Sequence, residues 1–399
     1  MNERSTEEIT RLLNSVNWDF QEYVSSSYPE DINSLHWYPA AFVPQIPSIL
    51  IQLFSTSGDT VLDPFAGSGV TLVEAAKQGR TFLGVDWNPY AIEISKAKFQ
   101  AINCEDWEWL ATFIERVRDK NIFEEPKLYC ERVGISDEIF EWFHLDTIKE
   151  LLAIHSCVVE EPDFSLLKKV VFSSVLKSCC SQKKHYTYVT DRCFPSELVY
   201  SNAKEKYINQ LILAKRASDK FRQHYSTLNS KEWRSLPNID EIIRVGDARN
   251  LNWIGNSEVN LVVTSPPYLG CNDYLKSMRL TYLFFPSFEI YDLTKEEIGA
   301  RCKRHNKLLE EEYIRDLTLA LKEFKRVIQK NGHLAIVFGQ GKGRVRKTDL
   351  IHLISELIVG KLHFVEVFNA ERSILFHRVR FPGVRKERIM VFQKSDNNV

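Results

Sequence analysis

Val61-Leu-Asp-Pro-Phe-Ala-Gly-Ser-Gly69 is the stretch of this 399-residue chain that decides the fold. Its apolar start indicates the end of a buried strand, and its two glycines allow a tight turn with close backbone approach. Residues 71–77 then predict a helix. A strand that breaks at glycines into a helix N-terminus is typical of a cofactor cradle. The glycine pair alone is weak evidence, because many α/β turns use glycine only to bend.

A second strand strengthens that interpretation. Thr81-Phe-Leu-Gly-Val-Asp86 follows one strand-and-helix unit later and ends in a carboxylate, where a nucleoside cofactor's ribose hydroxyls should lie. No Lys-Ser or Lys-Thr pair follows the glycines, so the turn does not match a phosphate loop. Asp63 would repel a pyrophosphate but suits a cation or an ammonium group. The sequence therefore predicts a nucleoside cofactor that is cationic rather than phosphorylated.

The bulk composition bounds the class of protein. The length allows one large domain with an insertion, or two domains. No apolar run approaches the ~18 residues of a membrane span, and the N-terminus does not resemble a signal peptide, so we expect a cytoplasmic protein. The eight cysteines include no Cys-x-x-Cys pair. We therefore expect free thiols in a reducing compartment and no metal site.

Charge is distributed unevenly although the net charge is only −1. Residues 103–163 carry sixteen acidic and six basic side chains, whereas residues 177–222 carry ten basic and four acidic ones. The basic block predicts a surface for phosphates, and the acidic block reads as a solvated helix surface. A stretch with interleaved aromatics and bases, residues 181–195, is typical of single-stranded nucleic-acid contacts. The alternative is a purely structural helical insertion.

The second informative motif is Val262-Val-Thr-Ser-Pro-Pro-Tyr268, at the end of an apolar strand. Two prolines fix the backbone and remove two amide donors, which leaves a rigid turn dominated by acceptors. An exocyclic base amine attacks a methyl sulfonium only when its lone pair is localised. The Ser265 hydroxyl and the Pro266 carbonyl supply acceptors for the amine protons. Tyr268 offers a ring that stacks on a base removed from the duplex.

With both motifs in view, the chain resembles the S-adenosylmethionine-dependent, amino-group-modifying DNA methyltransferases. The resemblance rests on the Asp63–Gly69 and Thr264–Tyr268 motifs and covers about residues 36–100 and 241–399. His36-Trp-Tyr-Pro-Ala-Ala-Phe-Val-Pro44 is similar to the segment that closes over the methionine end of the cofactor in this family. Serine before the prolines leans towards the cytosine-N4 branch. No Pro-Cys pair is present, which disfavours methylation of a ring carbon.

The resemblance and the residues together predict the site. The cradle and its flanks assign cofactor contacts to His36, Tyr38, Pro39, Asp63, Pro64, Phe65, Ala66, Gly67, Ser68, Gly69, Asp86, Trp87, Asp247 and Ala248. In this family a carboxylate at the place of Asp247 accepts a hydrogen bond from the cofactor's adenine amine. The predicted catalytic turn is Ser265, Pro266, Pro267 and Tyr268. Candidate DNA contacts are Lys183, Lys184, His185, Arg192, Arg301, Lys303, Arg304, Lys342, Arg344 and Arg346.

The fold predicted is an α/β, Rossmann-like class I methyltransferase with a seven-stranded, mostly parallel sheet. Residues 1–100 form the cofactor half, 101–240 a mainly helical insertion for target recognition, and 241–399 the catalytic half. Further strands are expected at 241–248, 260–264, 333–338, 363–368 and 388–392, the last two as an antiparallel pair. An amphipathic helix is expected from Tyr313 to Gln329, ended by Lys330-Asn-Gly332. We expect no C-terminal recognition domain.

The leading hypothesis is a site-specific methyltransferase acting on the N4 amine of a flipped cytosine in double-stranded DNA. It implies S-adenosylmethionine as cofactor, no metal, and a restriction-modification or defence system with a cognate endonuclease as a further partner. Adenine-N6 methylation is the nearest alternative, because it places an amine against the same acceptors. An RNA target, or a DNA-binding subunit without turnover, are the remaining alternatives.

Overall fold

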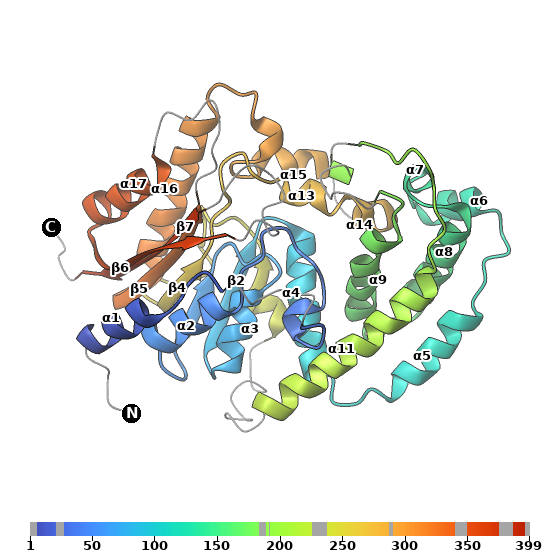
Figure 1. The fold of residues 1–399 in the computed structure, drawn as a ribbon, viewed down its shortest axis with the longest axis horizontal. Coiled ribbons are helices and arrows are strands. Elements are labelled where there is room, and N and C mark those ends of the chain that lie inside the picture. Colours follow the sequence, from blue (N-terminus) through green and yellow to red (C-terminus); the bar gives the residue numbers. More distant parts are fainter. Residues whose placement is uncertain are drawn as a thin grey trace.

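The strand that precedes the glycine turn lies inside a seven-stranded sheet (Figure 1). The computed structural model describes residues 6–20, 28–182, 189–190, 192–225, 238–286, 290–339, 349–374 and 386–395. One strand is antiparallel to both of its neighbours, and the other described pairings are parallel. The predicted α/β fold with a mostly parallel seven-stranded sheet is confirmed. In sheet order the strands are β3 (Ile243–Val245), β2 (Thr81–Asp86), β1 (Thr60–Asp63), β4 (Val259–Thr264), β5 (Ile328–Gly339), β7 (Lys386–Lys394) and β6 (Phe364–Ser373).

Both faces of the sheet are buried, because successive residues of its strands enter two separate apolar cores. Val61 belongs to one core and Leu62 to the other. The first core includes side chains of α1 (Thr6–Ser15), α2 (Gln45–Phe54), α3 (Val70–Lys77) and α4 (Pro89–Asn103). The second includes side chains of α16 (Leu309–Val327), α17 (Leu350–Glu356) and η4 (Leu357–Lys361). Continuous apolar runs are what strands covered on both sides require.

Strand order reverses between β1 and β4, which makes this edge the topological switch point. β1 pairs in parallel with β2 on one side and with β4 on the other. The crossover from β1 leads through α3 to β2, whereas the chain reaches β4 only two hundred residues later. Ligands of open α/β sheets bind at the carboxyl ends of the strands at such a point. Both sequence motifs lie there, at the ends of β1 and β4.

Between β2 and β3 the described chain is helical. The long helix α11 lies beside α9 and α5 in the lobe to the right of the sheet (Figure 1). Trp142, Phe172 and Tyr207 of this lobe belong to the same apolar core as Val61 of the sheet. The lobe is therefore continuous with the sheet's core. Its helices are α5 (Glu108–Asp119), α6 (Pro126–Val133), α7 (Ile139–Trp142), α8 (Leu145–Glu160), α9 (Ser165–Cys179) and α11 (Ala203–Tyr225).

Short elements connect the sheet to this lobe and complete the chain. The 3-10 turn η2 (Ile32–Ser34) precedes α2, and α12 (Ile239–Ile242) leads into β3. After β4 come α13 (Tyr274–Ser277), α14 (Arg279–Phe284), α15 (Ile290–Glu296) and η3 (Arg301–Lys303). No helix in the described ranges is long and apolar enough to cross a membrane, and no cluster of three metal-ligating side chains occurs in them.

Two predicted boundaries are wrong. Lys330-Asn-Gly332, expected to end the helix before the fifth strand, lies inside β5, where the register against β4 shifts. Glycine is needed there, since a Cβ on Gly332 would lie 2.7 Å from the carbonyl oxygen of Asn260. The third strand is three residues long instead of eight, because Asn238 caps a helical turn over Ile239–Ile242.

A buried ion pair joins the lobe to the chain that follows β4. The guanidinium of Arg279 at the start of α14 donates through Nε and a terminal nitrogen to the two oxygens of Glu138, just before α7. The two side chains are 13% and 17% exposed. Trp142 Nε1 also donates to Glu138 Oε1 over 2.9 Å. This junction therefore depends on one carboxylate that is largely shielded from water.

We expect Glu138→Gln to lower the free energy of unfolding by about 2–3 kcal/mol, because it leaves the Arg279 charge without its partner. Urea denaturation followed by tryptophan fluorescence measures this loss. Glu141→Gln is the control, since Glu141 is exposed one helical turn away. An equal, small effect of both substitutions would show that the ion pair does not hold the junction.

Candidate active site

The ends of β1 and β4 are joined by a hydrogen bond between the two motifs. Thr264 Oγ1 donates to Asp63 Oδ1 over 2.7 Å, and the backbone N–H of Phe65 donates to the same oxygen over 3.1 Å. Asp63 is 2% exposed. Burial raises the pKa of Asp63 to about 6, against the lowering effect of the hydrogen bond from Thr264. The cofactor motif and the Ser-Pro-Pro-Tyr motif thus meet at one buried carboxylate.

The glycine turn is held by the carboxylate of Asp86 at the end of β2. Gly67 N–H donates to Asp86 Oδ2 and Asn88 N–H donates to Oδ1, each over 2.8 Å. Burial raises the pKa of Asp86 to about 6, although these backbone donors favour the ionised form. Gly69 has a φ of 77°, and a Cβ there would lie 2.7 Å from Ser95 Oγ. The turn therefore needs glycine both for its conformation and for its close contact with α4.

Tyr38 lies against this turn. A Cβ on Gly67 would lie 3.1 Å from Tyr38 Cε1, and the Tyr38 ring stacks on Tyr274 at a centroid distance of 6.2 Å. The amide nitrogen of Asn88 donates to the Tyr38 hydroxyl over 3.3 Å. Burial, followed by the nearby Asp86 charge, raises the pKa of Tyr38 well above its usual value. Tyr38 therefore covers the turn at Gly67, and its contact with a cofactor stays a prediction.

Three residues of this arrangement were not predicted from the sequence. Asn88 Oδ1 accepts from the N–H of Tyr90 and from the Tyr282 hydroxyl, each over 3.0 Å, so it links α4 to α14. Glu297 accepts the backbone N–H of Tyr274 over 2.7 Å, and burial raises the pKa of Glu297 to about 8. Asn88 lies two residues after Asp86 and caps α4, a signal that was available. Tyr274 and Glu297 carry no motif that distinguishes them.

Two other predicted cofactor residues have protein partners in this arrangement. Both ring nitrogens of His36 are engaged, with the Trp37 carbonyl and with Ser173 Oγ on α9, the latter at 2.9 Å. Burial lowers the pKa of His36 to about 3, so the ring is neutral. Trp87 Nε1 donates to the Leu293 carbonyl over 2.9 Å. His36 therefore joins the N-terminal segment to the helical lobe, and Trp87 is anchored to α15.

The remaining predicted cofactor residues lie in or beside the cradle. Asp247, just after β3, accepts from the Arg249 guanidinium through both oxygens, and Arg249 also lies 3.2 Å from Asp316. Gly246 N–H donates to the Asp86 carbonyl over 3.0 Å, so the ends of β3 and β2 stay together. Pro39, Pro64, Ala66, Ser68 and Ala248 are buried, and Phe65 is half-buried.

The Ser-Pro-Pro-Tyr turn begins directly after β4. Ser265 is half-buried, and its hydroxyl donates to the Tyr268 hydroxyl over 3.3 Å. The Pro267 carbonyl accepts from the Tyr313 hydroxyl over 2.8 Å. Tyr268 is 8% exposed, and its ring contacts Phe338 edge-on at a centroid distance of 5.6 Å. This burial leaves the Tyr268 ring little surface for the base stacking that the sequence predicts.

Among the candidate DNA contacts, the structure describes Arg192, Arg301, Lys303 and Arg304. Lys303 Nζ donates to the carbonyls of Lys295 and Glu297, so its ammonium group stabilises the loop between α15 and η3. Arg192 lies 3.5 Å from Glu138 with half of its side chain exposed, and Arg304 is exposed. The candidates outside the described residues are Lys183, Lys184, His185, Lys342, Arg344 and Arg346.

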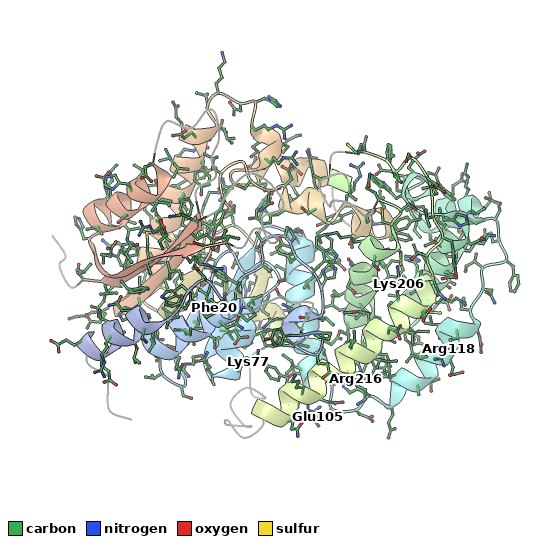
Figure 2. All side chains as sticks on the ribbon, in the orientation of Figure 1. Phe20, Lys77, Glu105, Arg118, Lys206 and Arg216 are labelled. Atoms are coloured by element: carbon green, nitrogen blue, oxygen red, sulfur yellow. The ribbon has the colours of Figure 1, made fainter. Side chains whose placement is uncertain are left out.

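Several lysine and arginine side chains of the basic block bind other groups of the protein. Figure 2 shows Lys206 and Arg216 along α11, with Arg118 on the neighbouring α5. Lys206 donates to the Ser178 carbonyl and to Ser201, while Lys204 donates to the carbonyls of Arg118 and Lys120. Arg216 lies 3.7 Å from Glu30. The prediction of a phosphate-binding surface from this block is therefore not supported for these α11 side chains.

Known proteins with sequences similar to this chain are methyltransferases. Residues 2–97 match the N6_N4_Mtase family model, described as DNA methylase. The Type II methyltransferase M.MjaII of Methanocaldococcus jannaschii is 22% identical, over 82% of this chain and 76% of that protein. The Type II methyltransferase M.MvaI of Kocuria varians is 24% identical, over 67% of this chain and 60% of that protein. The solved rRNA methyltransferase aviRa from Streptomyces viridochromogenes aligns with a TM-score of 0.36 and 12% identity, covering 94% of this chain and 96% of that chain.

The match to a family of DNA methylases agrees with the predicted S-adenosylmethionine cofactor. These matches do not separate the cytosine-N4 branch from the adenine-N6 branch. The match over residues 2–97 agrees with the predicted resemblance to the amino-group-modifying DNA methyltransferases.

Proposed function

We propose that the chain is a DNA methyltransferase that modifies the exocyclic N4 amine of a flipped cytosine, as the modification half of a restriction-modification system. The observation that carries the proposal is the Thr264–Asp63 hydrogen bond, which places Ser265 and the cofactor turn at one switch point. Relatives that are named Type II methyltransferases support the restriction-modification context. Serine before Pro-Pro-Tyr, which in the resembled family leans towards cytosine-N4 methylation, supports cytosine as the target.

The residues of the cradle fit S-adenosylmethionine. The turn from Asp63 to Gly69 contains no basic side chain, and two buried carboxylates flank it, which suits a cation and hydroxyl donors better than phosphate. We assign Asp86 to the ribose hydroxyls and Asp247, oriented by Arg249, to the adenine amine. Tyr38 closes the site over Gly67. The bound cofactor supplies an electrophilic methyl group on a sulfonium.

The chain's own contribution at the target amine is a set of acceptors. Ser265 and the Pro266 carbonyl accept the two amine protons, which localises the nitrogen lone pair for in-line attack. The Pro267 carbonyl accepts a hydrogen bond from the Tyr313 hydroxyl. This contact holds Pro267, the residue after Pro266, in place. Rigid acceptors reduce the reorganisation needed when the amine becomes cationic.

We assign target recognition to the helical lobe between β2 and β3, with double-stranded DNA as the partner. α9 of this lobe touches both the N-terminal cofactor segment, through His36, and α14 after the catalytic turn, through Thr281. The exposed side chains of Arg192 and Arg304 are proposed phosphate contacts. A cognate endonuclease is the partner that this function implies.

Incubation with methyl-labelled S-adenosylmethionine and unmethylated DNA, followed by nucleoside mass spectrometry, is expected to give N4-methylcytosine. Ser265→Ala should lower the rate at least about a hundredfold, because one acceptor of the amine is lost. Ser15→Ala is the control, since its hydroxyl only caps the exposed end of α1. Label on adenine would assign the chain to the other branch, and binding of cofactor without any label on DNA would contradict the proposed function.

Cofactor affinity should depend on pH through the two buried carboxylates. Their pKa values of about 6 mean that both are largely neutral at pH 5 and ionised at pH 7.5. A cationic ligand with hydroxyl donors favours the ionised forms, so the Kd for S-adenosylmethionine should fall as pH rises through 6. Calorimetric titrations from pH 5 to pH 8 measure this dependence.

Asp86→Asn should weaken cofactor binding about tenfold or more at pH 7.5 and flatten the pH dependence, since one charged acceptor is lost. Asp59→Asn is the matched control, because Asp59 lies at the opposite end of β1 and only accepts from Thr56. A Kd that stays constant over this pH range in the unmodified protein would argue against a role for these carboxylates.

A further inference from the structure

A chain of hydrogen bonds leads from the catalytic turn to a buried glutamate on a distant strand. Ser265 Oγ donates to the Tyr268 hydroxyl over 3.3 Å, and that hydroxyl donates to Glu387 Oε1 over 2.8 Å. Ser265 and Tyr268 follow β4, whereas Glu387 lies near the start of β7, 119 residues beyond Tyr268. The fold therefore brings a carboxylate behind the motif that the proposed chemistry uses.

Glu387 is paired with a buried cation. Arg372 on β6 is its register partner, and the guanidinium NH1 lies 3.5 Å from Glu387 Oε2. The side chains of Arg372 and Glu387 are 4% and 13% exposed. A buried ion pair is often no more stabilising than an apolar pair of the same volume. Stability alone therefore does not explain why this ion pair lies next to the Tyr268 hydroxyl.

The direction of this chain is fixed by chemistry. The single proton of the Tyr268 hydroxyl has two acceptors, Glu387 Oε1 at 2.8 Å and the Val337 carbonyl at 3.5 Å. An ionised carboxylate is the nearer and stronger acceptor, so the proton points to Glu387. The Tyr268 oxygen then accepts, and the Ser265 proton points to it. The remaining lone pairs of Ser265 are left as acceptors. Without the carboxylate, the serine hydroxyl is free to point its proton in another direction, including towards an approaching amine.

We propose that Glu387, held by Arg372, is a positioning residue that makes Ser265 an obligate hydrogen-bond acceptor for the target amine, and that the same chain carries the amine proton away after methyl transfer. This inference rests on the proposed function of Ser265. The amine nitrogen forms its bond to the methyl carbon as the carbon–sulfur bond of the donor breaks. The surplus amine proton then passes to Ser265 Oγ as the serine proton moves to Tyr268 and the tyrosine proton to Glu387.

Protonation of Glu387 should remove the fixed direction of the hydrogen bonds that run from Ser265 through Tyr268 to Glu387. Burial raises the pKa of Glu387 above its ordinary value, and the Arg372 charge and the Tyr268 hydrogen bond oppose that rise. Tyr274 is the other titratable group that influences Tyr268, whereas Lys386 and Arg388, the neighbours of Glu387 on β7, pair with Glu371. A neutral carboxyl group can donate, so kcat should fall as pH drops below the pKa of Glu387.

The test compares single-turnover methyl transfer at saturating cofactor and DNA between pH 5 and pH 8. Glu387→Gln is expected to lower kcat about tenfold to a hundredfold, to leave KM for both substrates nearly unchanged, and to remove the part of the acid limb that belongs to Glu387. Tyr268→Phe breaks the same chain while leaving the ion pair with Arg372 intact. It should lower kcat at least as much.

The double variant Glu387→Gln/Tyr268→Phe should be no slower than Tyr268→Phe alone, because members of one chain act as a unit. Independent, multiplying losses would overturn the proposal. So would retention of kcat and of the acid limb in Glu387→Gln. Glu371→Gln is the matched control on β6, where the carboxylate pairs at the surface with Lys386.

A measurement without turnover separates positioning from stability. In protein labelled at the tyrosine Cζ carbon, the Tyr268 resonance, assigned with Tyr268→Phe, should titrate with Glu387 and lose that titration in Glu387→Gln. A resonance insensitive to Glu387 would contradict the hydrogen-bond chain. If the unmodified protein transfers no methyl group to any DNA, the proposed function fails; if it does but Glu387→Gln behaves as Glu371→Gln, only this inference fails.

Discussion

The hydrogen bond from Thr264 to Asp63 is the constraint on which the rest of the site depends. It spans the switch point between β1 and β4, where the strand order runs to β2 and β3 on one side and to β5 on the other. The two partners are 201 residues apart in the sequence, and the direct pairing of β1 with β4 brings the two turns together. The position of Ser265 relative to the turn at Gly67 is therefore a property of the sheet, not of either loop.

Several carboxylates that are buried or largely shielded from water belong to this arrangement, and each has a protein partner that favours its ionised form. Asp63 and Asp86 accept backbone N–H groups, Glu297 caps the chain at Tyr274, and Glu387 faces Arg372. Burial raises the pKa of all four, so the ionised forms are costly in the free protein. A fold selected only for stability has little reason to bury so many acids at one edge of a sheet. A site that binds a cation and amine donors has such a reason.

Local patterns were sufficient for the sheet and for the two motifs. Apolar runs before Asp63 and before Ser265 predicted buried strands, and the two glycines predicted a tight turn, in which the structure gives Gly69 a left-handed conformation. Contacts that depend on distant segments were not accessible in the same way. Nothing local distinguishes Glu387 from any glutamate on an edge-proximal strand, and only the antiparallel register of β6 and β7 sets it beside Arg372. His36 was assigned to the cofactor site from the residues next to it in the sequence, whereas its hydrogen-bond partner Ser173 is 137 residues away.

The charge pattern failed for a related physical reason. A block of lysines and arginines predicts a phosphate surface only if the side chains point outwards, and on α11 several of them reach carbonyl groups of neighbouring helices. Those contacts fix α11 against α5 and α9 within the lobe. Through Ser173, α9 in turn meets both His36 and Thr281, so the lobe, the cofactor segment and the helix after the catalytic turn share one buried polar link. A movement of the lobe would have to break this link or carry His36 and Thr281 with it.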